Sequence, residues 1–316
     1  MNRLVRDPEA LTERGAVVIF TDEPGWHGRR LRAALAAERY VARFTSLCDC
    51  SIDLSGTVPR IAIPTFASLP QAAFVRGVAG GTLEQIITRL NILHTLRMVG
   101  VPVFNDGRAI ERTVDKGLTS FLLSRDGIPT PRTWVLESAA AARAVAECEF
   151  RAARKLVVKP LFGSQGNGVV KLGSLDEFDR LVPPGGIFYL QEYIDTGEGD
   201  FRDWRVFVID GHAVAAMQRR SSHWVTNRAQ GAVCEPASIH DGQLAQLAEA
   251  AAAALDVDYA GIDLLRDSTG HWYVSEVNGI PAWQGLQRAS GVDITQQLVS
   301  AFTGKIHRQT TLAAAG

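Results

Sequence analysis

Three oxygen-bearing side chains lie on two neighbouring apolar runs near the end of the chain. Asp263 lies within the run 259–265, and Glu276 and Asn278 end the next run. Carboxylate and amide oxygens are the ligands that Mg²⁺ and Mn²⁺ prefer. Strand alternation puts Glu276 and Asn278 on one face, and the turn at 267–270 folds Asp263 in beside them as a hairpin. The alternative is a solvent-facing edge hairpin, but an unpaired inward carboxylate is costly and a metal is its simplest compensation.

A lysine and a glycine-rich loop precede this pair of strands. Lys159 ends the apolar strand 155–159, and the loop that follows contains Gly163, Ser164, Gly166 and Gly168. Glycines let the loop backbone approach a polyphosphate, and its N–H groups can then donate to the phosphate oxygens. The spacing differs from the Walker pattern, and no helix pattern follows the loop. Alone, the segment reads equally well as an ordinary hairpin, but the metal set favours a phosphate cover with Lys159 as its point charge.

Taken in order, these pieces resemble the ATP-grasp superfamily, and within it the RimK-like branch of ATP-dependent carboxylate–amine ligases. The matching segments are 115–116, 127–131, 157–164, 191–194, 203–208 and 217–221, followed by Asn227 and the segment 276–278. The resemblance implies an α/β (α+β ATP-grasp) fold, in which an N-terminal α/β pre-ATP-grasp lobe precedes two lobes that sandwich ATP. A narrower likeness, in 278–287 and 76–85, is to the RimK-type proteins of tetrahydromethanopterin biosynthesis in methylotrophic bacteria.

The resemblance assigns the nucleotide contacts. Lys116 and Lys159 are expected to clamp the α- and β-phosphates, although Lys116 alone would read as a solvated helix lysine. The interlobe strand, with Gln191, Glu192, Tyr193 and Ile194, is expected to read the adenine edge through its backbone. Asp203 is expected to reach a ribose or to position an arginine, and Arg205 is grouped with it. The alternative for Asp203 and Arg205 is a surface ion pair.

Two arginines and an asparagine are the expected catalytic residues. Arg219 and Arg220 end an apolar strand and offer planar donor forks suited to a phosphate and a carboxylate. The resemblance places Arg219 on the phosphate side, Arg220 on the carboxylate side, and Asn227 beside them. Residues 222–227 depart from the acidic-aromatic-arginine run usual in RimK relatives, and this departure leaves the acceptor open.

The pattern along the chain predicts three lobes and a tail. Strands are expected at 16–20, 60–64 and 101–104, and helices at 29–39 behind a loop at 25–28, at 83–99 and at 243–255. The predicted divisions are an N-terminal α/β domain over 1–105, a central ATP-grasp lobe over 106–190, a C-terminal lobe with the metal site over 191–304, and a frayed tail over 305–316.

Composition is typical of a cytoplasmic enzyme. The chain has 316 residues, 46% of them hydrophobic, which is enough for several cores. A net charge of −1 gives no field for nucleic acid or a membrane surface. The four cysteines lack metal or disulfide spacing and are expected to be reduced, packed thiols. No apolar run approaches the roughly 20 residues of a membrane span.

The expected function is ATP-dependent amide formation through an acylphosphate, with ATP and two Mg²⁺ or Mn²⁺ ions. The resemblance suggests L-glutamate as the amine and a small-molecule carboxylate as the acceptor, for which a tetrahydromethanopterin-type one-carbon carrier leads. The alternatives are a RimK-like ligase acting on a protein C-terminus, a dipeptide ligase, a kinase, and a nucleotide-binding regulator without ligase activity. The sequence leaves open whether the protein forms a homo-oligomer.

Overall fold

A computed structural model describes residues 15–163, 166–197, 199–226, 231–239 and 242–315. The described chain divides into two compact units. Unit 1 holds the described residues up to Arg108 together with Ala282–Gln284 and the C-terminal segment from Asp293. Unit 2 holds Ala109–Pro281 and Gly285–Val292. The predicted α/β class is confirmed. Most of the two predicted ATP-grasp lobes lies in unit 2, but residues 282–284 and 293–304 of the predicted C-terminal lobe belong to unit 1.

Unit 1 is built on a parallel sheet with the strand order β2-β1-β5-β6. Its strands are β1 (Ala16–Phe20), β2 (Val41–Thr45), β5 (Ala72–Val75) and β6 (Val103–Phe104), with a separate antiparallel hairpin of β3 (Ser51–Asp53) and β4 (Arg60–Ala62). Its helices are α1 (Gly25–Ala37), η2 (Leu47–Asp49), α2 (Leu83–Met98) and α9 (Ile294–Ala315). Every residue of β5 is buried, as is typical of parallel strands covered on both faces.

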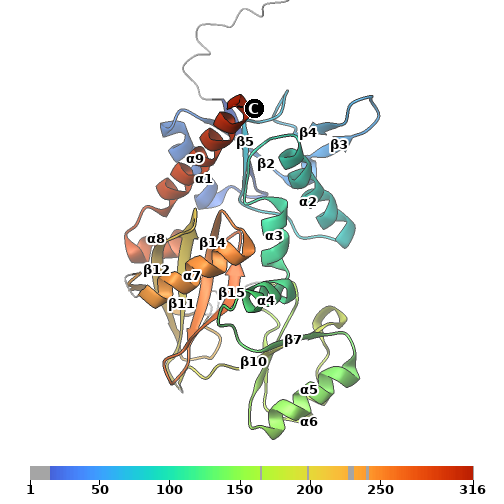
Figure 1. Cartoon of the computed structure of the whole chain (residues 1–316), viewed down its shortest axis with the longest axis vertical. Helices are drawn as coiled ribbons and strands as arrows, with labels where there is room; N and C mark the ends of the chain where they lie inside the picture. Colours follow the sequence, from blue (N-terminus) through green and yellow to red (C-terminus); the bar gives the residue numbers. More distant parts are fainter. Residues whose placement is uncertain (1–14, 164–165, 198, 227–230, 240–241, 316) are drawn as a thin grey trace, which may run out of the picture. The chain divides into compact units, whose positions relative to one another are not determined.

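Three predictions for unit 1 need correction. The expected loop at 25–28 forms the first turn of α1. The strand predicted at 60–64 forms only the outlying hairpin, whereas β2 and β5, which the sequence reading missed, build the main sheet. The predicted tail belongs to α9, whose Phe302 ring packs 5.5 Å from the Phe74 ring and 5.7 Å from that of Phe104. These contacts make the C-terminal helix part of the core of unit 1, where it packs beside α1 (Figure 1).

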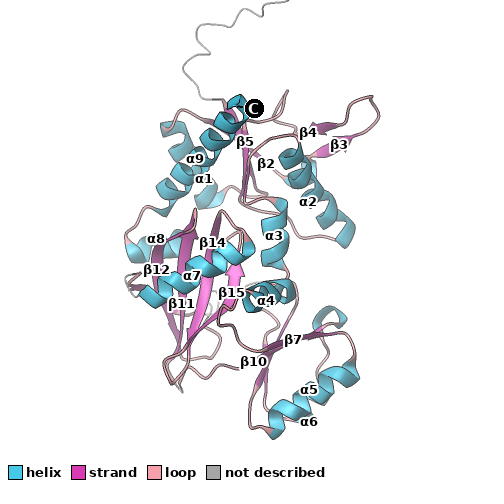
Figure 2. Cartoon of the chain, viewed as in Figure 1, coloured by secondary structure: helices cyan, strands magenta, loops and turns pink. Residues whose placement is uncertain are grey.

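Unit 2 contains two antiparallel sheets, each covered by helices (Figure 2). The first sheet has the order β7-β10-β8-β9, and the second has the order β13-β12-β11-β14-β15. The strands are β7 (Thr133–Leu136), β8 (Leu156–Lys159), β9 (Val170–Leu172), β10 (Phe188–Glu192), β11 (Phe201–Ile209), β12 (His212–Ser221), β13 (Val233–Ala237), β14 (Tyr259–Arg266) and β15 (Trp272–Asn278). The helices are α4 (Lys116–Arg125), α5 (Ala139–Arg151), α6 (Leu175–Asp179), η3 (Pro184–Gly186) and α7 (Gly242–Leu255), with α3 (Gly107–Val114) and α8 (Gln284–Ser290) at the boundaries with unit 1.

Each sheet of unit 2 has its own hydrophobic core. In the first, Phe178 of α6 stacks on Phe188 of β10 at 5.7 Å between ring centroids. In the second, the buried alanines of α7 let that helix pack closely on β11 and β14, together with Leu122 and Leu123 of α4. Polar side chains lie at the carboxyl end of β8 and in the middle of β11 and β14, outside both hydrophobic cores.

Two further sequence expectations concern the cysteines and membrane-spanning helices. Cys48 and Cys148 are exposed and Cys50 is buried, so the expected packing of all four thiols is wrong for the first two. Burial raises the pKa of the Cys50 thiol to about 11. No helix within the described ranges is both long and apolar enough to cross a lipid bilayer.

Candidate active site

A pocket of about 990 Å³, partly open to solvent, lies between the two sheets of unit 2. Twelve of the expected site residues line it: Lys116, Lys159, Gly163, Gly166, Gln191, Glu192, Tyr193, Ile194, Asp203, Arg219, Asp263 and Glu276. Gly168, Arg205, Arg220 and Asn278 are described but do not line it. Ser164 and Asn227 lie outside the described residues.

Lys116 is positioned by a helix cap. Asp115 is the N-cap of α4, and its Oδ1 accepts hydrogen bonds from the N–H groups of Gly117 at 2.8 Å and Leu118 at 3.0 Å. Such a cap satisfies backbone donors that the first helical turn leaves without partners. Lys116 is therefore held at the first position of α4, where its Nζ donates to Gly163 O at 2.6 Å and lies 3.9 Å from Glu276 Oε1.

Lys159 reaches the pocket from the end of β8. Its Nζ donates to Gln191 Oε1 at 2.7 Å. Burial lowers the pKa of Lys159, and the nearby Lys116 adds to that lowering, while Glu276 and Asp263 oppose it. Burial also lowers the pKa of Lys116. The two ammonium groups thus face one pocket in which an added polyanion would relieve both desolvation and mutual repulsion.

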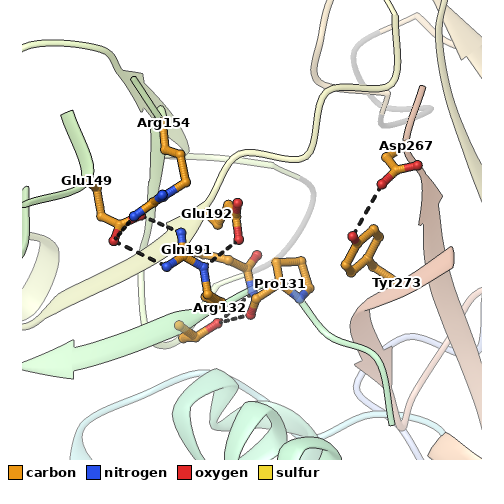
Figure 3. Close-up of polar contacts among 9 residues, drawn as sticks. Pro131, Arg132, Glu149, Arg154, Gln191, Glu192, Asp267 and Tyr273 are labelled. Carbon is orange, nitrogen blue, oxygen red and sulfur yellow. Dashed lines mark hydrogen bonds and ion pairs between the residues drawn. The ribbon is translucent and has the colours of Figure 1, made fainter. Parts of the chain in front are cut away.

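An ion network holds the end of the interlobe strand. Figure 3 shows Arg132 between Glu149 and Glu192, with Arg154 on the other side of Glu149. Arg132 Nε lies 2.9 Å from Glu192 Oε2, and its Nη2 lies 2.5 Å from Glu149 Oε2. Arg154 Nε donates to the same Glu149 oxygen at 2.6 Å. Glu149 is 2% exposed, so this network fixes the pocket-lining end of β10 to α5.

The wall near the interlobe strand is aromatic and apolar. Tyr193 and Trp224 meet edge to face at 6.0 Å, and Val157, Ile194 and Leu265 line the same pocket. Tyr193 N donates to Lys155 O at 2.9 Å, which holds the backbone of this segment. An apolar slot beside a held backbone suits a planar base read by its hydrogen-bonding edge.

Four charged residues form a ladder across β12, β11 and β14. The register places Asp203 opposite Arg219 and Arg205 opposite Asp263. Arg219 Nε lies 2.6 Å from Asp203 Oδ1, and Arg219 Nη2 lies 2.9 Å from Asp263 Oδ2. Arg205 Nε lies 2.6 Å from Asp263 Oδ1. Asp203 is thus paired with an arginine, but that arginine is Arg219 on the next strand rather than Arg205, and a contact with a ribose stays a prediction.

Burial acts to raise the pKa of Asp263, but the guanidiniums of Arg205 and Arg219 overcome it and lower the pKa to about 2. Burial likewise acts to lower the pKa of Arg219, and Asp263 and Asp203 raise it above its ordinary value. Asp263 and Arg219 therefore stay ionised at neutral pH, whereas burial raises the pKa of Asp203 against the opposing effect of Arg219.

Strand alternation separates the two arginines that were expected to act together. Arg219 is 4% exposed and faces the pocket, whereas Arg220 faces the opposite side of β12, is exposed, and pairs with Asp200. Successive side chains on a strand point to opposite faces, so Arg220 does not reach the pocket that Arg219 lines.

The expected metal ligands are brought together only in part. Asp263 and Glu276 are direct cross-strand partners on β14 and β15, and a register shift follows at Asp263 and Leu264. Asn278 pairs with Gly261, and its Oδ1 accepts from Ile280 N at 3.0 Å rather than lining the pocket. Within the described ranges, no group of three or more histidine, cysteine, aspartate and glutamate side chains is gathered to hold a metal.

Asp263 and Glu276 nevertheless fit a hard cation. The side chain of Glu276 is 39% exposed, lines the pocket and has only a long contact with Lys116 among its ion pairs with described residues. Arg205 and Arg219 make three contacts with Asp263, which leaves about one of the roughly four lone-pair positions of a carboxylate. The charge of Asp263 is thus compensated by arginines, where the sequence reading expected a metal to do so.

Several pocket and supporting residues were not expected from the sequence. Arg202, Thr226 and Ser275 line the pocket, and Arg132, Glu149 and Arg154 hold its edge. The pocket-lining residues lie within or beside motifs already singled out. The ion network has no local signal, because its members come from three separate segments.

Comparison with known proteins identifies the family. A model of the RimK-like ATP-grasp domain matches residues 113–302. The tetrahydromethanopterin:alpha-L-glutamate ligase of Methanococcus maripaludis is 36% identical over 235 residues, which cover 72% of this chain and 77% of that protein. The alpha-aminoadipate–LysW ligase LysX of Saccharolobus solfataricus is 30% identical over 213 residues, covering 65% and 75% of the two chains. The chain therefore belongs to the RimK-like ATP-grasp family.

The fold agrees with this assignment. The structure of the ATP-grasp ligase PsnB complexed with a minimal precursor, Mg and ADP matches with a TM-score of 0.69 at 20% identity, covering 93% of this chain and 98% of that one. ATP-grasp ligases bind ATP and Mg²⁺, and this protein is an enzyme of that class. The family and fold predicted from the sequence are confirmed.

Proposed function

We propose that this protein uses ATP to add L-glutamate to a carboxylate of a small cofactor, with a tetrahydromethanopterin-type one-carbon carrier as the leading acceptor. The observation that carries the proposal is the single pocket that gathers two lysines, a buried arginine and two opposed carboxylates. The likeness to the Methanococcus maripaludis ligase, which is named for both this acceptor and glutamate, supports the choice of substrates.

The two lysines bind the polyphosphate. Lys116 and Lys159 enter the pocket from α4 and β8, and each has ammonium protons beyond the one donated to Gly163 O or Gln191 Oε1. The backbone around Gly163 and Gly166 covers the phosphates, and the segment from Gln191 to Ile194 borders the base. Binding there fixes the γ-phosphate in the direction of the five-stranded sheet, where the charge ladder lies.

Asp263 and Glu276 would hold the metal, and we infer two ions, with Asn278 as a ligand only if its side chain turns toward the pocket. Bound divalent cations neutralise phosphate charge as the phosphoryl group moves. Arg219 has its Nε and Nη2 bonded to Asp203 and Asp263, and its Nη1 is proposed to donate to the transferring phosphate. Asn227 is proposed to bind the acceptor. Arg220, which the resemblance places on the carboxylate side, lies on the opposite face of β12 from the pocket and is not part of the proposed site.

The reaction forms and consumes an acylphosphate. The substrate carboxylate oxygen attacks the γ-phosphorus, the bond to the β-phosphate oxygen breaks, and ADP leaves. The glutamate amine then attacks the acyl carbon, phosphate leaves, and the amine loses a proton to solvent or phosphate. The enzyme supplies no covalent nucleophile. Its residues bind the anions, orient the carboxylate and exclude water from an intermediate that hydrolyses readily.

The test is incubation of the protein with ATP, Mg²⁺, glutamate and a tetrahydromethanopterin-type pterin, followed by mass spectrometry. A mass gain of one or more glutamyl residues with ADP release supports the proposal. Glutamyl gains only on a protein C-terminus, or ADP release with another amino acid alone, would instead indicate a protein-modifying or dipeptide ligase. ADP formation that needs no amine would indicate a kinase, and nucleotide binding without turnover would indicate a regulator.

A further inference from the structure

A chain of buried hydroxyl and amide groups runs behind the pocket from α4 to Lys159. Ser120 Oγ lies 2.8 Å from Tyr189 OH, and Tyr189 OH accepts from Gln191 Nε2 at 3.1 Å. Gln191 Oε1 then accepts from Lys159 Nζ at 2.7 Å. Tyr189 and Gln191 are 1% and 2% exposed, and Tyr189 does not line the pocket. The chain therefore touches the nucleotide site only through Lys159 and Gln191.

The orientation of the Gln191 amide is fixed by a second hydroxyl. Thr133 Oγ1 donates to Pro131 O at 2.8 Å, so its oxygen is left to accept from Gln191 Nε2 at 3.0 Å. Both N–H bonds of the amide are then used, by Thr133 and Tyr189. If the amide turned over, Nε2 would face the ammonium of Lys159, donor to donor, and both hydroxyls would lose the N–H group from which they accept. The hydroxyls thus hold Oε1 toward Lys159.

The phenol at the centre of this chain is well suited to that task. Burial raises the pKa of Tyr189, so the phenol stays protonated at neutral pH and can donate to Ser120 while it accepts from Gln191. Tyr189 is also the register partner of Lys159 across β10 and β8. Ser120 lies one turn beyond Lys116 on α4. The chain consequently links the helix that carries one pocket lysine to the ammonium group of the other.

A neutral anchor has a specific advantage at this position. A carboxylate in place of Gln191 would neutralise Lys159 and compete with phosphate for it, whereas an amide oxygen orients the ammonium and leaves its charge. Lys116 repels Lys159 across the same pocket, so Lys159 needs an attachment that holds it against this repulsion.

We propose that Tyr189, with Ser120, is a positioning residue for nucleotide binding that acts through Gln191 on the ammonium of Lys159. This inference rests on the proposed role of Lys159 as a phosphate-binding lysine. It predicts that loss of the Tyr189 hydroxyl weakens ATP binding although the hydroxyl never touches ATP, and that the loss disappears once Lys159 is gone.

The experiment is a double-mutant cycle of Tyr189→Phe and Lys159→Ala, read by calorimetric titration with ATP and Mg²⁺. Tyr189→Phe alone should weaken ATP affinity about threefold to tenfold, the range expected for one internal hydrogen bond. In the Lys159→Ala background the same change should add nothing, because its effect passes through Lys159. The matched control is Tyr273→Phe, which removes a hydroxyl bonded to Asp267 in the same unit (Figure 3) and should leave ATP affinity at the wild-type value.

Wild-type affinity in a folded Tyr189→Phe variant would overturn the inference, and so would an equal loss in both backgrounds, which would indicate general packing. Thermal unfolding establishes that the variants are folded. If Tyr189→Phe does not fold, Ser120→Ala tests the same link from α4 and should weaken ATP binding in the same direction. If the wild-type protein binds no ATP, the proposed nucleotide site itself is wrong. If the wild-type protein binds ATP and Tyr189→Phe binds it equally well, only the role of Tyr189 is wrong.

Discussion

The two sheets of unit 2 hold buried charges in opposite ways. On the four-stranded sheet, a neutral amide and hydroxyl chain holds the buried ammonium group of Lys159. On the five-stranded sheet, Arg205 and Arg219 balance Asp203 and Asp263 in a ladder of ion pairs. The first arrangement leaves the lysine charge available to an anion. The second leaves almost no net charge, so removal of one member exposes the rest to an uncompensated burial cost.

Breaking the ladder should have the largest effect. Asp263→Ala removes the carboxylate shared by Arg205 and Arg219, and breaking a buried pair typically costs about 3–5 kcal/mol. We expect the free energy of unfolding, measured by urea denaturation, to decrease by about that amount, and turnover to be lost. The control, Asp126→Ala, removes an exposed carboxylate paired with Arg125 and should leave stability unchanged. An equal free energy of unfolding for Asp263→Ala and wild type would contradict the idea that the ladder stabilises the fold.

Glu276, the cross-strand partner of Asp263, separates chemistry from stability. Its side chain is 39% exposed and makes no short ion pair with described residues. Glu276→Ala should therefore abolish turnover, by loss of a proposed metal ligand, while the free energy of unfolding changes by no more than about 0.5 kcal/mol, as is usual for surface substitutions. Glutamyl transfer and urea denaturation are the measurements, with Glu276→Gln as the volume-matched control. Wild-type turnover at saturating Mg²⁺ would remove Glu276 from the site.

The cation on the four-stranded sheet should act mainly on binding. Lys159→Ala removes a charge-assisted phosphate contact worth about 1.5–3 kcal/mol, so ATP affinity should weaken at least about tenfold. Calorimetry measures this change. Lys155→Ala is the charge-matched control, because Lys155 is exposed just before β8 and contributes only its backbone carbonyl to the site. Unchanged ATP affinity in Lys159→Ala would place the phosphates elsewhere.

Unit 1 offers a smaller test of neutral anchoring. His27 Nε2 accepts from the N–H groups of Trp283 at 3.2 Å and Gln284 at 3.3 Å, which only an unprotonated ring nitrogen can do. Burial, with a further contribution from Arg76, lowers the pKa of His27 to about 4. In the unfolded chain its pKa is about 6.5, so between pH 6.5 and 4 the unfolded state binds a proton that the folded state does not. Stability should fall as pH falls across this window.

The measurement is urea denaturation at pH 7 and pH 4.5 for wild type and His27→Gln, whose amide oxygen accepts without titrating. The loss of stability on acidification should be smaller in His27→Gln than in wild type. His212→Gln is the control, because His212 is exposed, and it should behave as wild type. The same pH dependence in His27→Gln and wild type would show that His27 does not contribute.

The sequence by itself determined the family, the α/β class and most of the pocket. Asp263 and Glu276 were predictable as neighbours because a short turn joins their strands, and Lys159 and the Gly163 loop were predictable because one segment carries both. Local spacing fixes these relations, since a hairpin or a strand end leaves the chain few alternatives. For the same reason α2 and β1 appeared where the apolar pattern placed them.

Only the tertiary structure decided which distant side chains compensate one another. The strand order β12-β11-β14 placed Arg219 and Arg205 on Asp263, and the pairing of β10 with β8 placed Tyr189 and Gln191 behind Lys159. The C-terminal helix α9 joined the core of unit 1 through Phe302, although the sequence had placed Phe302 in the C-terminal lobe and residues 305–316 in a frayed tail. Sequence periodicity tells which face a residue occupies, but the partner on that face depends on which strands or helices become neighbours, and that choice is made by burial of the whole apolar surface.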